Sequence, residues 1–478
     1  MVNFTRRISL LFGILIFSLA NSYSQTAQGT WKGDLAVMGQ KLPLIIHLNE
    51  SNGEWEGTID SPSQGAMGIK MNKVLFDGMM LSFEMSVGNA SYEGVMVNED
   101  IKGNFSQGGM KLPLDFHRIK DGVADMLMPS RPQHPVEPFD YEIKEVSFKN
   151  ETAAIMLKGT LTIPTDKDSY PGVILISGSG PHNRDHEMMA HKPFWVLADY
   201  LTSRGIAVLR YDERGVGEST GSFENATTMD FKDDADAALE FLKKQDKINP
   251  GQLGVIGHSE GGLITWMLGD TREDLAFLIS LAGPVMPITE MMKKQTEDIT
   301  RVAGASEEIV KMLTNRNQEV YKIIVDSDSV EEVKPKIRAL FEQELKELNV
   351  PESLFESELD KLQQAYEAKL DLWMMNFLKM DPITYIQNID IPTFAAFGEK
   401  DLQVNAAQNA NRLLEIFDQK SNLLTLKVYE NLNHLFQAAQ TGAIDEYAKI
   451  EETINYLLLE DITEFILNQN PTAASSPL

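Results

Sequence analysis

The segment Leu253-Gly254-Val255-Ile256-Gly257-His258-Ser259-Glu260-Gly261-Gly262 passes from an apolar run into the start of a helix. The apolar run has the pattern of a buried strand, announced by the turn residues Asn249-Pro250-Gly251, and the apolar stretch 262–268 predicts the helix. The glycines on either side of Ser259 lack a Cβ, so strand and helix can approach closely around a serine in a strained conformation. The pattern predicts a sharp elbow that exposes the Ser259 hydroxyl beside the N–H groups of the helix start.

Gly217-Glu218-Ser219-Thr220-Gly221 has the same Gly-x-Ser-x-Gly spacing. It follows the polar stretch 212–215, with no strand pattern directly before it and no clear helix pattern after it. Because the elbow needs a strand on one side and a helix on the other, we interpret Ser219 as a loop residue and Ser259 as the candidate nucleophile.

A serine hydroxyl becomes a good nucleophile only when a base within hydrogen-bond reach removes its proton. His434 directly follows the last expected strand and is the only histidine after Ser259 in the chain. His258 lies inside the elbow, where a side chain more often points away from the serine. A carboxylate must orient the base, and Asp401 directly follows a strand between Ser259 and His434. Glu399 is the alternative acid, but we interpret it as a solvent-exposed charge in a turn.

Two N–H donors must stabilise the oxyanion of such a reaction. One is expected from the backbone of Glu260, directly after the nucleophile. The loop 177–181 follows the apolar run 173–176 and contains two glycines, which allow close backbone approach. We expect the N–H of Ser179 to be the second donor, with Gly180 as the alternative.

From residue 141 onward, strand patterns alternate with helix patterns. This alternation predicts a mostly parallel eight-stranded sheet with helices on both faces, and active sites in such sheets lie at the carboxyl ends of the strands. The segment 284–390 is helical, charged and Met-rich, which predicts a helical cap; a surface lobe without a role at the site is the alternative. The expected cap helices are Thr289–Thr300, Ser306–Asn315, Val330–Leu348 and Pro351–Lys379. The expected strands are Ile143–Lys149, Ala153–Ile163, Gly172–Ser177, Ile206–Tyr211, Leu253–Gly257, Ala276–Ala282, Ile391–Gly398 and Leu423–Tyr429.

Residues 141–478 are expected to form one domain, which resembles the α/β-hydrolase family. It is most similar to secreted bacterial esterases and serine-aminopeptidase-like hydrolases. The resemblance rests on the loop 177–181, the segment 212–219, the elbow at Ser259, and the late Asp401 and His434, all in the family's order. It implies a serine hydrolase that cleaves carboxylic esters through an acyl-enzyme and these three residues. Cleavage of peptide or amide bonds by the same triad, and a noncatalytic binding protein of the same fold, are the alternatives.

Three histidines, His182, His186 and His191, follow the candidate oxyanion loop, with Asp185 among them. We interpret His182 and Asp185 as candidate substrate-binding residues. A metal site is the alternative, but the spacing matches no zinc pattern. Because acyl transfer to a serine needs no metal, we expect no cofactor.

The region before residue 141 has a different character. Residues 1–24 combine two arginines with an apolar stretch and small residues, which is typical of a signal peptide; an uncleaved membrane anchor is the alternative. Residues 25–120 show short alternating runs between turns, which predict an antiparallel barrel or sandwich. Residues 121–140 carry spaced prolines, which favour an extended linker.

Composition restricts the partners. With 43 basic and 70 acidic residues, the formal net charge is −27, which argues against nucleic acid as a partner. The chain has no cysteine, so it has no disulfide and no thiolate metal site. The expected signal peptide predicts a secreted or periplasmic protein without stable membrane insertion. The resemblance implies that the substrate is a small-molecule or oligomeric ester.

Overall fold

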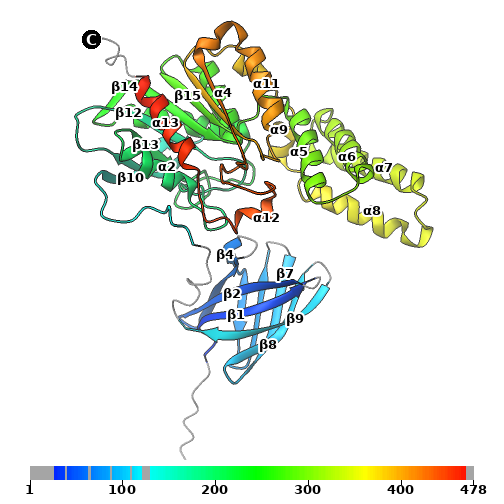
Figure 1. The fold of residues 1–478 in the computed structure, drawn as a ribbon. Coiled ribbons are helices and arrows are strands. Elements are labelled where there is room, and N and C mark those ends of the chain that lie inside the picture. Colours follow the sequence, from blue (N-terminus) through cyan, green and yellow to red (C-terminus); the bar gives the residue numbers. More distant parts are fainter. Residues whose placement is uncertain are drawn as a thin grey trace, which may run out of the picture. The chain divides into compact units, whose positions relative to one another are not determined.

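The computed structural model describes residues 26–37, 40–62, 66–86, 89–107, 110–120 and 130–469. The described chain divides near residue 128 into two compact units, coloured blue to cyan and cyan to red in Figure 1. The expected signal peptide, residues 1–24, lies outside the described residues.

The first unit is a closed antiparallel barrel. Its strand order is β2-β1-β9-β8-β7-β6-β5-β3-β4, and the additional pairing of β2 with β3 closes the ring. Trp31, Tyr92 and Phe116 fill the interior, each at most 1% exposed. Of the two architectures expected for this region, the closed sheet is the one observed. The strands are β1 (Gly29–Val37), β2 (Gln40–Ser51), β3 (Glu54–Ser61), β4 (Ala66–Lys70), β5 (Lys73–Phe76), β6 (Met80–Met85), β7 (Ala90–Val97), β8 (Asp100–Gln107) and β9 (Met110–Ile119).

The second unit contains the mostly parallel eight-stranded sheet that the sequence predicts. Its order is β10-β11-β13-β12-β14-β15-β16-β17. The β10–β11 and β11–β13 pairs are antiparallel and all later neighbours are parallel. The carboxyl ends of β12, β14, β16 and β17 therefore meet at one edge of the sheet. The strands are β10 (Glu142–Asn150), β11 (Ile155–Ile163), β12 (Tyr170–Ile176), β13 (Ala207–Tyr211), β14 (Ile248–His258), β15 (Phe277–Leu281), β16 (Thr393–Gly398) and β17 (Leu424–Tyr429).

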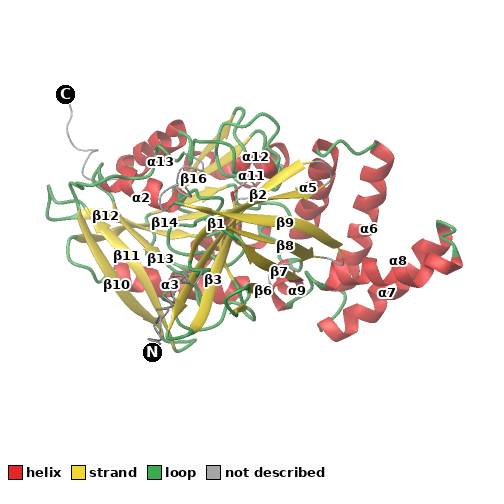
Figure 2. Ribbon diagram, turned by 90° about the horizontal axis from the view of Figure 1, so that it is seen from below, coloured by secondary structure: helices red, strands yellow, loops and turns green. Residues whose placement is uncertain are grey.

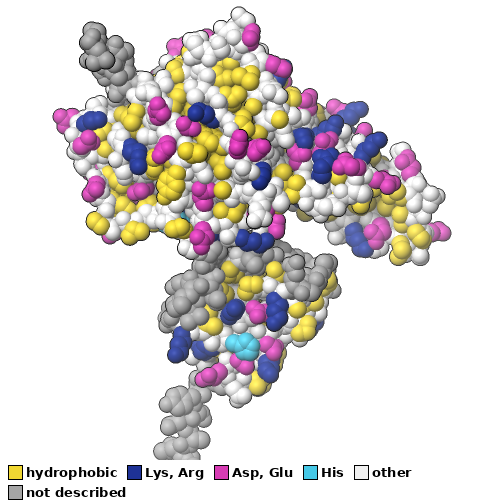
Figure 3. Space-filling model, viewed as in Figure 1, with side chains coloured by type: hydrophobic (Ala, Val, Ile, Leu, Met, Phe, Trp, Pro, Cys, Tyr) yellow, Lys and Arg dark blue, Asp and Glu magenta, His cyan; other side chains and the backbone are white. Residues whose placement is uncertain are grey.

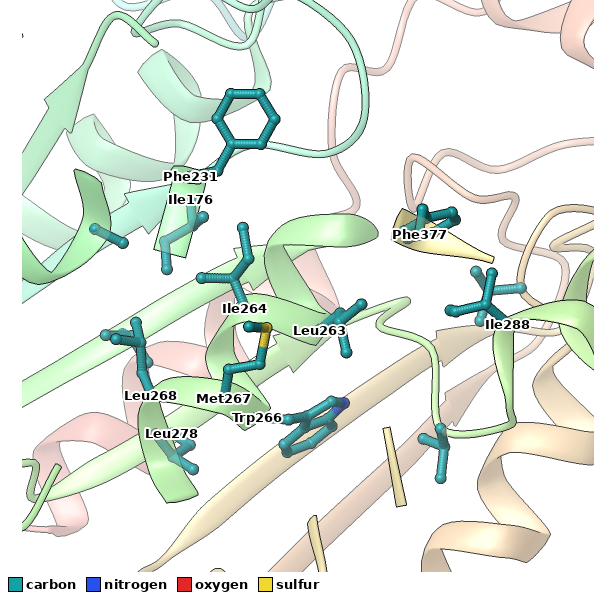
Figure 4. Close-up of a cluster of buried hydrophobic side chains, with 14 of the residues drawn as sticks. Ile176, Phe231, Leu263, Ile264, Trp266, Met267, Leu268, Leu278, Ile288 and Phe377 are labelled. Atoms are coloured by element: carbon teal, nitrogen blue, oxygen red, sulfur yellow. The ribbon is translucent and has the colours of Figure 1, made fainter. Parts of the chain in front are cut away.

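Helices cover both faces of this sheet (Figure 2). Along β12, Ile174 belongs to the apolar cluster of one face and Leu175 to that of the other, because alternate residues of a strand point to opposite sides. Figure 4 shows Ile264, Met267 and Leu268 within the larger of these clusters. The helices on that face are α3 (Thr228–Leu242), α4 (Glu260–Thr271) and α11 (Ala406–Ile416), and those on the other are α2 (Pro193–Thr202) and α13 (Tyr456–Asn468).

A helical insertion separates β15 from β16, as expected for the cap, and its helices lie together beside the sheet in Figures 1 and 2. The stretch expected as one helix over 351–379 is two helices. The break between them contains the buried Leu370, and the Asp371 carboxylate caps the next helix by accepting the N–H of Met374 at 2.7 Å. The helices are α5 (Ile288–Val302), α6 (Glu307–Val325), α7 (Val330–Glu347), α8 (Glu352–Glu367), α9 (Leu372–Phe377) and α10 (Ile383–Ile386); shorter elements further on are η3 (Asp418–Leu423) and α12 (Ile444–Tyr447).

The surface of the cap intersperses acidic and basic side chains (Figure 3), consistent with a solvated exterior. None of the helices in the described ranges is long and apolar enough to cross a membrane.

The expected linker, residues 121–140, is described only from residue 130. From there the chain is attached to the second unit. The Arg131 guanidinium donates to the carbonyls of Ile450, Met189 and Ala448 at 2.8–3.0 Å. The described part of the expected linker is therefore held against the second unit at Arg131.

Candidate active site

The turn between β14 and α4 holds Ser259 in a conformation that few non-glycine residues adopt, with φ 55° and ψ −117°. The Ser259 N–H donates to the Leu281 carbonyl at 2.9 Å, and its carbonyl accepts the Gly262 N–H at 2.8 Å. A strained backbone of this kind persists only where its surroundings hold it in place. The elbow expected at Ser259 is present.

The glycines of the elbow are required by close backbone contacts. A Cβ at Gly257 would overlap the carbonyl of Gly261, and a Cβ at Gly261 would overlap the carbonyl of Ile176. Strand β14, helix α4 and the end of β12 can therefore approach one another only because these positions have no side chain.

Asp401 and His434 meet at the carboxyl ends of β16 and β17. One Asp401 oxygen lies 2.7 Å from His434 Nδ1, and the other accepts the N–H groups of Gln403 and Val404, both at 2.8 Å. The two side chains are 1% and 3% exposed. Since a carboxylate accepts hydrogen bonds, this contact places the imidazole proton on Nδ1 and leaves Nε2 available to accept a proton.

The two alternatives from the sequence have other partners. Glu399 accepts the N–H of Asn431 at 2.9 Å and closes a turn. The Ser219 hydroxyl donates to the Asp212 carbonyl at 2.7 Å and accepts the Lys158 N–H at 2.9 Å. Ser219 lies in a loop, as expected, and its hydroxyl is used to attach that loop to β11.

A cavity of about 220 Å³ is lined by four of the candidate residues, namely Ser179, His182, Ser259 and His434. Ser259 and His434 both line it, with Gly178 and Ser179 from the loop after β12. The cap supplies further walls, so the insertion contributes to the site and is not a separate lobe. The cap side chains are Met291, Met292 and Gln295 of α5, and Trp373 and Phe377 of α9.

The candidate oxyanion donors lie on the two segments next to the nucleophile. Glu260 is the first residue of α4, where a backbone N–H has no carbonyl one turn earlier in the helix to bind. A Cβ at Gly178 would lie 3.1 Å from the Ser259 Cβ, so this loop passes directly beside the nucleophile. Ser179 lines the cavity, whereas Gly180, with φ 108°, is not among the residues that line it.

Three histidines form a row of imidazoles that ends at the base. The ring centroids of His182 and His186 are 4.1 Å apart, those of His186 and His258 5.3 Å, and those of His258 and His434 4.8 Å. Burial lowers the pKa of His182, lowers that of His186 further, and lowers that of His258 to about 3. These imidazoles are therefore uncharged near neutral pH. Nε2 of His258 donates to the His434 carbonyl at 2.9 Å, and Nε2 of His182 donates to the Ser179 carbonyl at 3.1 Å.

The other candidates near this row have structural contacts. Asp185 does not line the cavity; its carboxylate forms an ion pair with the buried Arg210. His191 lies apart from the row, with Nε2 2.9 Å from the Tyr447 carbonyl and Nδ1 3.0 Å from the Thr453 hydroxyl. In the described part of the chain, no three His, Cys, Asp or Glu side chains are arranged to hold a metal ion.

The Glu260 side chain joins the cap to the elbow, which the sequence does not reveal. Its carboxyl accepts the Thr228 hydroxyl at 2.6 Å and the Trp373 indole N–H at 2.8 Å, and it also interacts with the Ser179 hydroxyl. Burial raises the pKa of Glu260 against the effect of these three donors. The residue after the nucleophile thus contacts a helix, the oxyanion loop and the cap at once.

The fold and this constellation define an α/β-hydrolase. A family model described as serine aminopeptidase, S33, matches residues 194–438, a range that contains Ser259, Asp401 and His434. The chain belongs to this family of serine hydrolases.

Two relatives bear different activities in their names. The chain is 26% identical over 302 residues to esterase EstD of Thermotoga maritima, covering 63% of this chain and 61% of EstD. It is 31% identical over 138 residues to the uncharacterized peptidase YuxL of Bacillus subtilis, covering 27% of this chain and 20% of YuxL. The chain thus spans less than two thirds of the length of either relative.

Solved structures with a related fold include an esterase of Pyrococcus furiosus, which is 16% identical with a TM-score of 0.41 and covers 72% of this chain and 98% of its own. Est1E of Butyrivibrio proteoclasticus, solved with bound ferulic acid, is 17% identical with a TM-score of 0.41 and covers 68% of this chain and 98% of its own.

Proposed function

We propose that the protein hydrolyses uncharged carboxylic esters through an acyl-enzyme formed on Ser259. The Ser259 oxygen attacks the ester carbonyl while His434 Nε2 takes the hydroxyl proton, and the same proton is then given to the leaving alcohol. Water, deprotonated by His434 in turn, releases the acid and restores the serine. Asp401 holds the imidazole and stabilises its charged form during both steps.

The N–H of Glu260 and the N–H of Ser179 stabilise the oxyanion in this proposal. The hydrogen bond from His182 to the Ser179 carbonyl supports the loop that carries the second donor. His182 also lines the cavity, where its uncharged ring contacts the substrate.

The absence of fixed charge around the serine supports an ester over a peptide with a free amino terminus. An aminopeptidase needs carboxylates in its pocket to bind the substrate ammonium group. Among the described residues that line the cavity of Ser259, none is Asp, Glu, Lys or Arg. The nearby carboxyl of Glu260 is directed to Thr228 and Trp373 instead.

A matched pair of serine variants tests the proposal. Ser259→Ala should abolish hydrolysis of p-nitrophenyl acetate and labelling by a fluorophosphonate probe, whereas Ser219→Ala, in the second Gly-x-Ser-x-Gly copy, should retain both. Near wild-type turnover by Ser259→Ala would refute the assignment. Faster cleavage of aminoacyl p-nitroanilides than of the matching esters would favour the peptidase alternative, and a wild-type chain that binds no probe would favour a noncatalytic role.

We also infer that the protein is exported to the periplasm or the cell exterior. This inference depends on the basic and apolar pattern of residues 1–24 alone. N-terminal sequencing of the mature protein and its cellular fraction provide the test; a chain that begins at Met1 in the cytoplasm would contradict it.

A further inference from the structure

The cap contains a second cavity, of about 420 Å³, lined by residues of α5, α6, α7, α8 and α9. Met292 on α5 lines both this cavity and the one that holds Ser259. At the other side, Met374 lines the cap cavity while its neighbour Trp373 lines the triad cavity. The two spaces therefore share a wall formed by α5 and α9, and the shared side chain is a flexible methionine.

Four of the polar side chains that line the cap cavity, Thr296, Arg316, Asn317 and Tyr366, have partners within the cap. The Thr296 hydroxyl accepts the Asn317 amide at 3.0 Å, and Asn317 in turn accepts the Tyr366 hydroxyl. Arg316 forms a bidentate pair with Glu344, with Nε 2.8 Å from the carboxylate.

Apart from Thr300, Tyr321 and the exposed Lys369, the rest of the cavity lining is apolar. The apolar residues include Leu313, Val320, Ile324, Leu362 and Leu370. A molecule that fits such a space needs no hydrogen-bond partners of its own.

The sizes of the two cavities indicate how a substrate divides between them. Ligand pockets usually have volumes of about 300–1,000 Å³. The triad cavity, at about 220 Å³, is smaller than this range and holds little more than a reacting ester group, whereas the cap cavity, at about 420 Å³, lies within it.

We propose that the cap cavity is a binding site for the apolar hydrocarbon chain of the ester, which enters past Met292. This inference rests on the proposed esterase function and adds its substrate class: esters of medium-length aliphatic chains. Movement of the Met292 side chain opens the shared wall, and the chain then lies between α5, α6 and α8.

Two ester series test the inference and identify which side of the ester carries the chain. One series varies the acyl group of p-nitrophenyl esters from acetate upward, and the other varies the alcohol of acetate esters. Each buried methylene should raise kcat/KM about fourfold until the cavity is full. The series that shows this rise identifies the chain as acyl or alcohol, and a flat response in both series would overturn the proposal while short-ester hydrolysis still supports the esterase.

Matched substitutions on α8 connect the effect to the cavity. Ala365 lines the cavity and is exposed, whereas Ala368, also exposed, is the residue directly after the same helix and does not line the cavity. Ala365→Trp should lower the ratio of long-chain to short-chain kcat/KM by at least about tenfold, the equivalent of two buried methylenes, and Ala368→Trp should leave the ratio unchanged. Met292→Phe, which stiffens the shared wall, should lower the ratio in the same direction.

Binding to the Ser259→Ala chain gives a readout that does not depend on turnover. Calorimetry with octanoyl and acetyl esters should show tighter binding of the longer ester, and Ala365→Trp in the same background should remove that difference. Equal ratios and equal affinities for the Ala365→Trp and Ala368→Trp chains would overturn the proposal. A wild-type chain that binds the long ester but cleaves no ester would refute the proposed function alone.

Discussion

The carboxyl edge of the sheet and the helical cap build the same cavity by different means. At the sheet edge, backbone atoms fix the positions: a Cβ at Gly261 would overlap the Ile176 carbonyl, and Asp401 is held by two N–H groups. In the cap, side chains of helices such as Met292 and Trp373 provide the walls. A backbone contact tolerates almost no change, whereas a helix side chain can be exchanged with small cost. We therefore expect substitutions at the sheet edge to impair the proposed chemistry and substitutions in the cap to change the choice of substrate.

The largest expected effect is at Asp401. Asp401→Asn would direct an amide N–H at His434 Nδ1 and so favour the wrong imidazole tautomer, which should lower kcat by roughly 10³–10⁴-fold. Glu399→Gln, in the same turn, keeps an oxygen that accepts the Asn431 N–H and should change kcat by less than about twofold. Steady-state kinetics with p-nitrophenyl acetate measures both; comparable losses in the two variants would remove the distinction between triad acid and turn residue.

Glycine substitutions compare the two regions directly. Gly261→Ala places a Cβ onto the carbonyls of Ile176 and Ser177 and should destabilise the fold by about 1–3 kcal/mol or more. In Gly304→Ala, just after α5, the added Cβ meets no atom within 4 Å. The only cost is backbone strain, because φ is 84°, and this should destabilise the fold by about 1 kcal/mol. Urea midpoints for the loss of esterase activity measure both. A cap variant that is less stable than the elbow variant would contradict the view that the sheet edge is the rigid region.

The sequence predicts the sheet edge well because each candidate residue directly follows a strand. Ser259, Asp401 and His434 could be assigned from strand patterns, since parallel strands bring their carboxyl ends together wherever they lie in the chain. The parallel sheet and the existence of a cap follow from the same periodicity. The barrel, by contrast, could be separated from a sandwich only by the pairing of β2 with β3.

The cap side of the site could not be predicted, because it depends on how helices pack. Periodicity marks Met292 and Trp373 as facing inward, but not which cavity they face. The hydrogen bond from Trp373 to Glu260 joins residues far apart in sequence, and no local pattern signals it. Asp185 illustrates the opposite case: its position after the oxyanion loop suggested the substrate pocket, yet the buried Arg210 provides its partner.

Removing the hydrogen bond between Trp373 in the cap and Glu260 at the elbow should have an intermediate effect on KM. Trp373→Phe keeps the stacked contact with Phe377, at 4.8 Å between ring centroids, but removes the N–H that binds Glu260. Loss of this bond to a buried carboxyl should cost about 1–3 kcal/mol of cap attachment and raise KM several-fold. Thr228→Val removes a donor to the same oxygen from the sheet side but keeps the Trp373 bond, so it should raise KM less than Trp373→Phe does. If both variants shift KM equally, the Trp373 bond has no special role in placing the cap.

The smallest effect concerns Glu213, whose carboxylate accepts the His182 N–H at 2.8 Å behind the oxyanion loop. Burial, together with the charges of Glu260 and Asp234, raises the pKa of Glu213 well above its ordinary value. The folded chain therefore holds this proton at pH values where the unfolded chain has lost it, so stability falls as pH rises from about 4.5 through the raised pKa. Glu213→Gln cannot ionise at this side chain. The Tm of the variant minus that of the wild type should therefore rise by a few degrees between pH 5 and pH 8. Glu224→Gln, an exposed glutamate on the same connection, should show no such trend. If the Tm difference between Glu213→Gln and the wild type does not change with pH, Glu213 has no raised pKa in the folded chain. The contrast between sheet edge and cap would then depend only on the backbone contacts described above.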